Sequence, residues 1–419
     1  MAGHAGRRWA VRLVVLGVAV FLILGGPLPT ALGRLGTERL RRIVPAISPL
    51  VVLGEALSQK TWYVVTFHLL PPVMVLAMGV WRGRWFCRWI CPAGTLHSLA
   101  GAAGGKIGRR TLIKRRVAPY LFYIILVSAL FGLPQLLWLD PLSSFARLAS
   151  GGRTVAAWVY GGLIPLFLLL GLFQPVLWCS HFCPLGYLFD LSKAVARKPR
   201  QTFLADRRRI LVGLLVGVPA ATVLPAFLRR KKLEILPPGG SDQRRFASAC
   251  TRCYACVAAC PAKIITIKAG GGIAELFMPV VDLNAGEQVC REDCHACTQV
   301  CPTGAITQLT LIQKQRTQMA RARIRRTACI AWSEGEVCMV CDEYCPYNAI
   351  DIEYRRSDIY QDVPLPVISP QRCRGCGYCR KACVSRHPDK AIDLLPLESQ
   401  SRAMDTARKP ATKTEGEVV

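Results

Sequence analysis

Five apolar stretches divide the front half of the chain, at residues 10–30, 62–80, 117–139, 154–178 and 210–228. A helix that crosses a bilayer needs about 20 mostly apolar residues, and each stretch meets or nearly meets that length. The pattern predicts a membrane α-helical bundle of four or five transmembrane helices. The back half alternates cysteine-rich segments with short strand-like runs, which predicts an α+β domain there.

Basic residues are unevenly distributed along the chain and predict an orientation for these helices. Residues 1–209 contain 26 Lys and Arg against 5 Asp and Glu, whereas residues 210–419 contain 28 against 21. Most of the positive charge between apolar stretches lies at 82–116 and 193–209, and such loops stay on the cytoplasmic side. The net charge of +28 is then a topology signal, so we expect no nucleic-acid partner.

The fifth apolar stretch decides where the back half lies. It follows Asp206-Arg207-Arg208-Arg209, which resembles a twin-arginine export signal. If this stretch crosses, the chain is a multi-pass protein of the cytoplasmic (inner) membrane with its back half on the periplasmic side. If it does not cross, the back half lies on the inner face.

The second and fourth apolar stretches end in the same motif, Cys-x3-Cys-Pro-x-Gly. One copy contains Cys87 and Cys91, and the other contains Cys179 and Cys183. Two apolar stretches separate the copies, so they emerge on one face as a duplicated two-helix unit. Their four thiolates are candidates to hold one iron–sulfur cluster or metal ion together. The alternative is that reduced thiols pack the helix ends.

Three histidines are candidate catalytic residues for proton transfer. His68 lies inside the second apolar stretch, where an ionisable side chain is a functional candidate. It would accept a proton or bind haem, or alternatively pack as a hydrogen-bonded residue. His97 and His181 lie beside the two Cys-x3-Cys motifs.

The other 16 cysteines form four quartets with the spacing Cys-x2-Cys-x2-Cys-x3-Cys, in which the first gap is wider in the second and third quartets. Three closely spaced thiolates bind one [4Fe–4S] cluster, and the fourth binds the other cluster of a pair. The quartets predict four [4Fe–4S] clusters, with the first quartet paired either with the second or with the fourth. They are Cys250, Cys253, Cys256 and Cys260; Cys290, Cys294, Cys297 and Cys301; Cys329, Cys338, Cys341 and Cys345; and Cys373, Cys376, Cys379 and Cys383.

A strand-like run follows each quartet, at 264–267, 305–309, 349–352 and 391–395. Quartet plus strand is the half-unit of a ferredoxin, here repeated four times. Zinc ribbons instead use Cys-x2-Cys pairs that are set well apart. The predicted domains are a transmembrane module at 1–205, a fifth apolar segment and linker at 206–240, a ferredoxin-like module with four quartets at 241–397, and a disordered tail at 398–419.

With these motifs, residues 1–205 resemble the NapH-type membrane quinol dehydrogenase subunit. Residues 206–397 resemble the NapG/MauM-type ferredoxin proteins, most specifically in the widened quartet from Cys329 to Cys341. The two resemblances imply a fusion of both proteins. One departure is that the NapH family carries its own quartets after the fourth apolar stretch, whereas this chain has the fifth stretch there.

The function that the resemblance implies is electron transfer from membrane quinol, through four [4Fe–4S] clusters, to a periplasmic reductase or a cytochrome-type acceptor. The chain would act as an electron-carrying component of a quinol dehydrogenase. Two alternatives are an iron–sulfur assembly or maturation factor for a metalloenzyme and a thiol-based redox regulator. Turnover of quinol would separate the first function from the other two.

Overall fold

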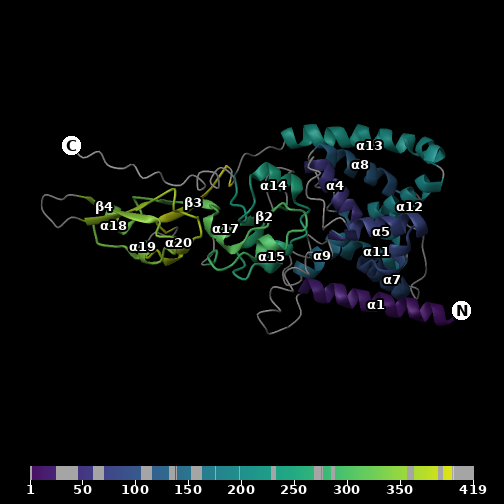
Figure 1. The fold of residues 1–419 in the computed structure, drawn as a ribbon, viewed down its shortest axis with the longest axis horizontal. Helices are drawn as coiled ribbons and strands as arrows, with labels where there is room; N and C mark the ends of the chain where they lie inside the picture. The colour runs from purple at the N-terminus through teal and green to yellow at the C-terminus, as the bar shows by residue number, and fades with distance from the viewer. Residues whose placement is uncertain are drawn as a thin grey trace.

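The structure, a computed structural model, has a helical part and a cysteine-rich part. The helical part lies at one end of an elongated molecule and the cysteine-rich part at the other (Figure 1). The residues that it describes are 2–24, 46–59, 70–104, 116–131, 137, 139–151, 163–174, 176–197, 199–227, 233–268, 275, 277–284, 288–355, 363–385, 390–398 and 400.

The helical part is built from helices that pack around aromatic side chains. Phe86, Phe122 and Phe189 are buried in its core, and the rings of Phe86 and Phe189 lie 5.9 Å apart. Its elements are α1 (Ala2–Leu24), α4 (Pro49–Gln59), α5 (Leu70–Arg82), α6 (Trp85–Trp89), α7 (Pro92–Ala103), α8 (Ala118–Leu130), α9 (Pro141–Gly151), α11 (Leu163–Phe173), the π-helix η3 (Trp178–Phe182), α12 (Pro184–Arg197) and α13 (Pro199–Phe227).

The prediction of a membrane bundle with four or five transmembrane helices is wrong. Across the described residues, the structure contains no helix that is both long enough and apolar enough to cross a bilayer. Within the described residues, the helices at the second, third and fourth expected spans have 13 residues (α5), 13 residues (α8) and 11 residues (α11). A span needs about 20.

The predicted localisation is also wrong, because it depended on these spans. A multi-pass position in the cytoplasmic membrane, with residues 241–397 on the periplasmic side, required apolar crossings that the described helices do not supply. Loop charge sets an orientation only for helices that cross a membrane.

The cysteine-rich part combines short helices with three two-stranded antiparallel sheets in its described residues. The sheets pair β1 with β2, β3 with β6, and β4 with β5, and their registers match Ile265 with Val281, Ala320 with Pro396, and Ile350 with Ile368. The elements are α14 (Gln243–Ala249), α15 (Ala255–Ala259), β1 (Ile265–Ile267), β2 (Pro279–Val281), α16 (Ala296–Gln299), α17 (Leu311–Arg316), β3 (Ala320–Ile324), α18 (Ile330–Ser333), α19 (Val340–Glu343), β4 (Ile350–Arg355), β5 (Val363–Ile368), α20 (Tyr378–Ala382) and β6 (Ile392–Pro396).

Three of the four expected strands are present, as β1, β4 and β6. The run at 305–309 forms no strand; instead the carbonyl of its last residue, Leu309, accepts a hydrogen bond from the Gln299 side chain at 2.9 Å. A side chain thus donates the hydrogen bond that a backbone N–H of a neighbouring strand would otherwise donate.

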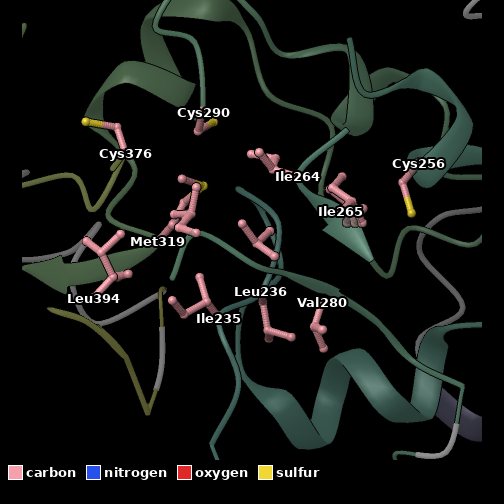
Figure 2. Packing of buried hydrophobic residues seen from close by; sticks show 14 of the residues in the cluster. Ile235, Leu236, Cys256, Ile264, Ile265, Val280, Cys290, Met319, Cys376 and Leu394 are labelled. Atoms are coloured by element: carbon pink, nitrogen blue, oxygen red, sulfur yellow. The ribbon is translucent and has the colours of Figure 1, made fainter. Parts of the chain in front are cut away.

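The core of the cysteine-rich part consists of buried apolar side chains that pack together with the cysteines. Figure 2 shows Ile264 and Ile265 lying between Cys256 on one side and Cys290 on the other. Apolar side chains here exclude water and lower the local dielectric. The two parts meet where α9 packs against α15 and α4 packs against α14 (Figure 1).

One glycine in this part has no room for a side chain. Gly375 has a φ of +68°, and a Cβ there would lie 2.3 Å from the Ala320 carbonyl oxygen in β3. Gly335 has a similar φ of +74° but nothing within 4 Å. We expect Gly335→Ala to cost about 1 to 2 kcal/mol, the cost of a left-handed residue that has a Cβ. Gly375→Ala should cost clearly more, because β3 must also move.

Thermal unfolding of the full chain, followed by circular dichroism, measures both variants against the native protein. Gly335→Ala is the matched control for backbone strain without a steric clash. Equal losses of stability in the two variants would contradict the close approach of Gly375 to β3.

Candidate functional site

The structure brings the 16 quartet cysteines together in four groups, each with three cysteines from one quartet and the last cysteine of a partner quartet. This grouping pairs the first quartet with the second and the third with the fourth, which decides between the two pairings left open by the sequence. We name the groups site 1 (Cys250, Cys253, Cys256, Cys301), site 2 (Cys290, Cys294, Cys297, Cys260), site 3 (Cys329, Cys338, Cys341, Cys383) and site 4 (Cys373, Cys376, Cys379, Cys345).

The walls of these sites fit an iron–sulfur cluster. Sites 2, 3 and 4 each surround a small cavity that all four of their cysteines line together with apolar side chains. Backbone amides point at the sulfurs that come from the partner quartet: the Ile306 N–H donates to Cys301 Sγ at 3.4 Å, and the Ala349 N–H donates to Cys345 Sγ at 3.3 Å. Such hydrogen bonds stabilise thiolates that bind a metal.

The spacing of these cysteines does not suit a single metal ion. Within the described ranges, no group of three or more His, Cys, Asp or Glu side chains is positioned to hold one ion. Ligands of a zinc ion must approach it to about 2.3 Å, which brings their sulfurs close together. A [4Fe–4S] cluster takes four thiolates around a larger inorganic core, so it accepts a wider group.

Burial strongly favours the neutral form of the free thiols. Desolvation raises the pKa of Cys253 to about 12 and that of Cys376 to about 12. For Cys290, burial raises the pKa to about 11, and the nearby Lys314 ammonium acts against this shift. Because a metal ligand must be a thiolate, binding of a positively charged iron centre would release protons here.

The four sites follow one another along the molecule in the order 3, 4, 2, 1. The charge of Cys379 in site 4 interacts with Cys341 in site 3. The Cys290 N–H of site 2 donates to the Cys376 carbonyl of site 4 at 2.9 Å. Site 2 adjoins site 1, because Cys297 of site 2 is close enough to Cys256 of site 1 to interact with it electrostatically. Site 1 lies next to the helical part, because Cys256 belongs to α15, which packs on α9.

The two Cys-x3-Cys motifs meet inside the helical part with the same local geometry. Cys91 precedes α7 and accepts a hydrogen bond from the Gly94 N–H at 3.4 Å, and Cys183 precedes α12 and accepts one from the Gly186 N–H at 3.3 Å. The charge of Cys87 interacts with all three other thiols of the motifs. We name Cys87, Cys91, Cys179 and Cys183 site 5.

Burial also raises the pKa of the site 5 thiols, to about 12 for Cys91 and about 11 for Cys179. Arg84 acts against this shift at Cys179, and it donates to the Cys179 carbonyl at 2.6 Å. Its guanidinium also binds Asp190 through two hydrogen bonds of 2.9 and 2.7 Å. The salt bridge therefore fixes the second motif against α12.

A cavity of about 670 Å³ lies beside site 5 and was not anticipated from the sequence. Arg84, Tyr187 and Asp206 are among its lining residues. The buried Asp206 carboxylate accepts hydrogen bonds from the Tyr187 hydroxyl at 2.6 Å and the Tyr123 hydroxyl at 3.2 Å. A signal for this site was present, since Asp190 and Asp206 are two of only five acidic residues before position 210.

The three candidate histidines have different surroundings. His68 lies outside the described residues. His97 is buried in α7, and desolvation lowers its pKa to about 4, so the neutral ring is favoured at neutral pH. His181 is half-buried, and its Nδ1 lies 2.6 Å from the Ser180 hydroxyl, which lines the cavity.

Comparison with known proteins links both parts of the chain to iron–sulfur clusters. Residues 249–305 match the model of a 4Fe–4S dicluster domain, and residues 65–110 and 155–201 match that of a 4Fe–4S binding domain. No solved structure matches the chain. The buried cysteine groups and these matches define an iron–sulfur protein of the ferredoxin type.

The relatives place the chain in a family. It is 32% identical to the ferredoxin-type protein NapG of Escherichia coli K12 over 206 residues, which is 47% of this chain and 86% of that protein. It is 29% identical over 230 residues to the methylamine utilization ferredoxin-type protein MauM of Methylobacillus flagellatus, or 53% of this chain and 96% of that one. The chain belongs to the NapG family of ferredoxin-type proteins.

His97 provides a test of the packing around site 5 through the pH dependence of stability. Its pKa of about 4 lies below the value of about 6.5 for an unfolded histidine, so unfolding takes up a proton between these values. The stabilisation is fully present above pH 6.5 and is lost as the pH falls toward 4, by about 3 kcal/mol at most. His97→Gln should remove this loss.

The measurement is the difference in unfolding free energy between the native protein and the variant at several pH values. Ser98→Ala, on the same helix, is the control without an ionisable group. A His97→Gln profile that runs parallel to the native one would show that the imidazole is solvated.

Proposed function

We propose that this protein passes electrons one at a time from a quinol to a reductase, by way of site 5 and sites 1, 2, 4 and 3. The observation that carries the proposal is the end-to-end order of the cysteine groups. Electron tunnelling weakens steeply with distance, so a redox protein needs centres in unbroken succession. The NapG family of ferredoxin-type proteins, to which the chain belongs, supports an electron carrier.

Each of sites 1 to 4 would hold one [4Fe–4S] cluster, which supplies one-electron oxidation and reduction when bound. The chain's own residues provide the thiolates, keep water out with apolar walls, and direct amide groups at the sulfurs. Site 5 would hold a further iron–sulfur cluster, in keeping with the 4Fe–4S binding domain matched there. The corresponding domains are a helical module at 1–205 that α13 (Pro199–Phe227) extends, a linker that ends at residue 240, and the cluster module at 241–397.

Quinol is the proposed donor, and the cavity beside site 5 is its proposed site. Oxidation of a quinol releases two protons with its two electrons, so a base must lie nearby. Tyr187 and Asp206 are hydrogen-bonded to each other in the wall of the cavity, and His181 is a further candidate proton acceptor. The resemblance of residues 1–205 to the NapH-type quinol dehydrogenase subunit supports the same donor.

The iron content tests the proposed cofactors. The variant with Cys87, Cys91, Cys179 and Cys183 all changed to Ser should hold about sixteen iron atoms, four in each of sites 1 to 4. The native protein should hold more, because site 5 is then occupied. Iron and acid-labile sulfide are measured on anaerobically purified full-length protein.

A content well below sixteen in the variant contradicts four clusters. Equal contents in both proteins would mean that the site 5 thiols only pack the helix ends. The double variant Ser98→Ala and Ser192→Ala controls for general disturbance of the helical part.

Electron delivery tests the donor. In the double variant Cys91→Ser, Cys183→Ser, a water-soluble quinol should reduce sites 1 to 4 no faster than in the uncatalysed background reaction. The reason is that the path from the cavity is broken. Dithionite should still reduce these sites, which shows that they are intact. The measurement is anaerobic stopped-flow bleaching of the cluster absorbance.

Unchanged reduction by quinol in this variant would remove site 5 from the path. Native protein that delivers metal or clusters to a partner enzyme without oxidising quinol would instead indicate a maturation factor. A quinol-independent response of the site 5 thiols to oxidants would indicate a redox regulator.

A further inference from the structure

Two buried ionisable residues lie at a helix of the helical part that packs against the cysteine-rich part. Asp140 immediately precedes α9, and Arg147 lies within α9. Their residues are 0% and 2% exposed, respectively, which is rare for charged side chains. Because α9 packs against α15 of the cysteine-rich part, both charges lie close to the junction of the two parts (Figure 1).

Asp140 is directed toward site 5. Its carboxylate accepts hydrogen bonds from the Ser48 hydroxyl at 2.7 Å and from the Ser143 N–H at 2.9 Å. Burial raises the pKa of Asp140, and these hydrogen bonds act against that shift. The carboxyl group is close enough to interact with the thiols of Cys91 and Cys183.

Arg147 is directed toward site 1. Its guanidinium donates to the Ser144 hydroxyl at 2.5 Å and interacts through its charge with Cys253 and Tyr254 across the junction. Desolvation lowers the pKa of Arg147 to about 10, and the charges of Tyr254, Cys253 and Asp140 act against that shift. The side chain therefore keeps its positive charge at neutral pH.

Site 1 has a more positive surrounding than its partner site. Besides Arg147, the buried Arg252 donates to the Cys250 carbonyl at 2.7 Å. At site 2, the Lys314 ammonium interacts with Cys290 and Cys297, and Arg291, which also lines that site, is exposed and paired with Asp293. A cluster bound by four thiolates is an anion that gains a further negative charge on reduction, and a cation in a low-dielectric site favours that reduced state.

We propose that Arg147, contributed by the helical part, sets the reduction potential of site 1 and makes it the first acceptor for electrons that leave site 5. The proposal rests on the proposed function, since site 1 must hold a cluster. Arg147 would not bind the cluster itself. Its positive charge would stabilise the extra electron at site 1. Arg147 favours the electron at site 1 and so directs its transfer across the junction.

The test is a redox titration of the fully loaded, full-length protein, followed by electron paramagnetic resonance. The site 1 signal is assigned as the one that changes in a Cys253→Ser variant. Arg147→Met should shift the site 1 reduction equilibrium at least tenfold toward the oxidised form, which is 59 mV for one electron. Arg147→Lys keeps the charge and should restore most of the native value.

Lys314→Met is the matched control, since it removes a buried cation beside site 2. It should lower the midpoint of site 2 and leave that of site 1 unchanged. Arg147→Gln is a second neutral variant for the case in which Arg147→Met does not fold. If either neutral variant leaves the site 1 midpoint at the native value, the proposal is wrong.

Equal shifts in Arg147→Met and Arg147→Lys would also overturn it, because they would indicate packing as the cause. Failure of the proposed function gives a different result. In that case the native protein lacks the signal that Cys253→Ser changes, and its iron content falls short.

Discussion

The exchange of one cysteine between partner quartets is the constraint on which the rest of the structure depends. In sites 1 to 4, three cysteines close together in the sequence need a fourth from a more distant segment, such as Cys301 for site 1. Each exchange is reciprocal, since Cys260 completes site 2. The two quartets of a pair must therefore lie side by side, with a segment from each crossing to the other. The strands between them form short two-stranded sheets in place of one large sheet.

The exchange also decides how the sites succeed one another. Paired sites are held close because the same peptide segment contributes to both, and the two pairs join where the Cys290 N–H meets the Cys376 carbonyl. The helical part continues the series through α9, with site 5 on its far side. Burial of so many thiols is unfavourable for their charged form, so cluster binding and folding of this part depend on each other.

The sequence predicted the chemistry of the sites better than the architecture around them. Quartet spacing follows directly from what a cluster requires, and the two Cys-x3-Cys motifs do come together as site 5. Quartet pairing depends on contacts such as that between Cys256 and Cys301, which no local pattern encodes. In place of the strand expected at 305–309, the side chains of Gln299 and Thr298 bind the Leu309 carbonyl.

The membrane bundle was the main error, and its cause is physical. Average hydrophobicity records apolar residues but not what they pack against, and apolar side chains such as Phe122 and Phe189 are buried in a core between helices. The buried charges were missed for a related reason. Asp140 and Arg147 have no motif around them, and their importance comes from burial at a junction that only the tertiary structure creates.

The most direct test of the central claim is the arrangement of iron in the folded chain. Crystals of anaerobically prepared protein, with diffraction measured at the iron absorption edge, locate every cluster independently of the protein coordinates. We expect iron peaks in the order of sites 3, 4, 2 and 1 along the molecule, followed by site 5 in the helical part. Iron centres that pair the first quartet with the fourth, or a gap in the series at site 1, would contradict a continuous path for electrons.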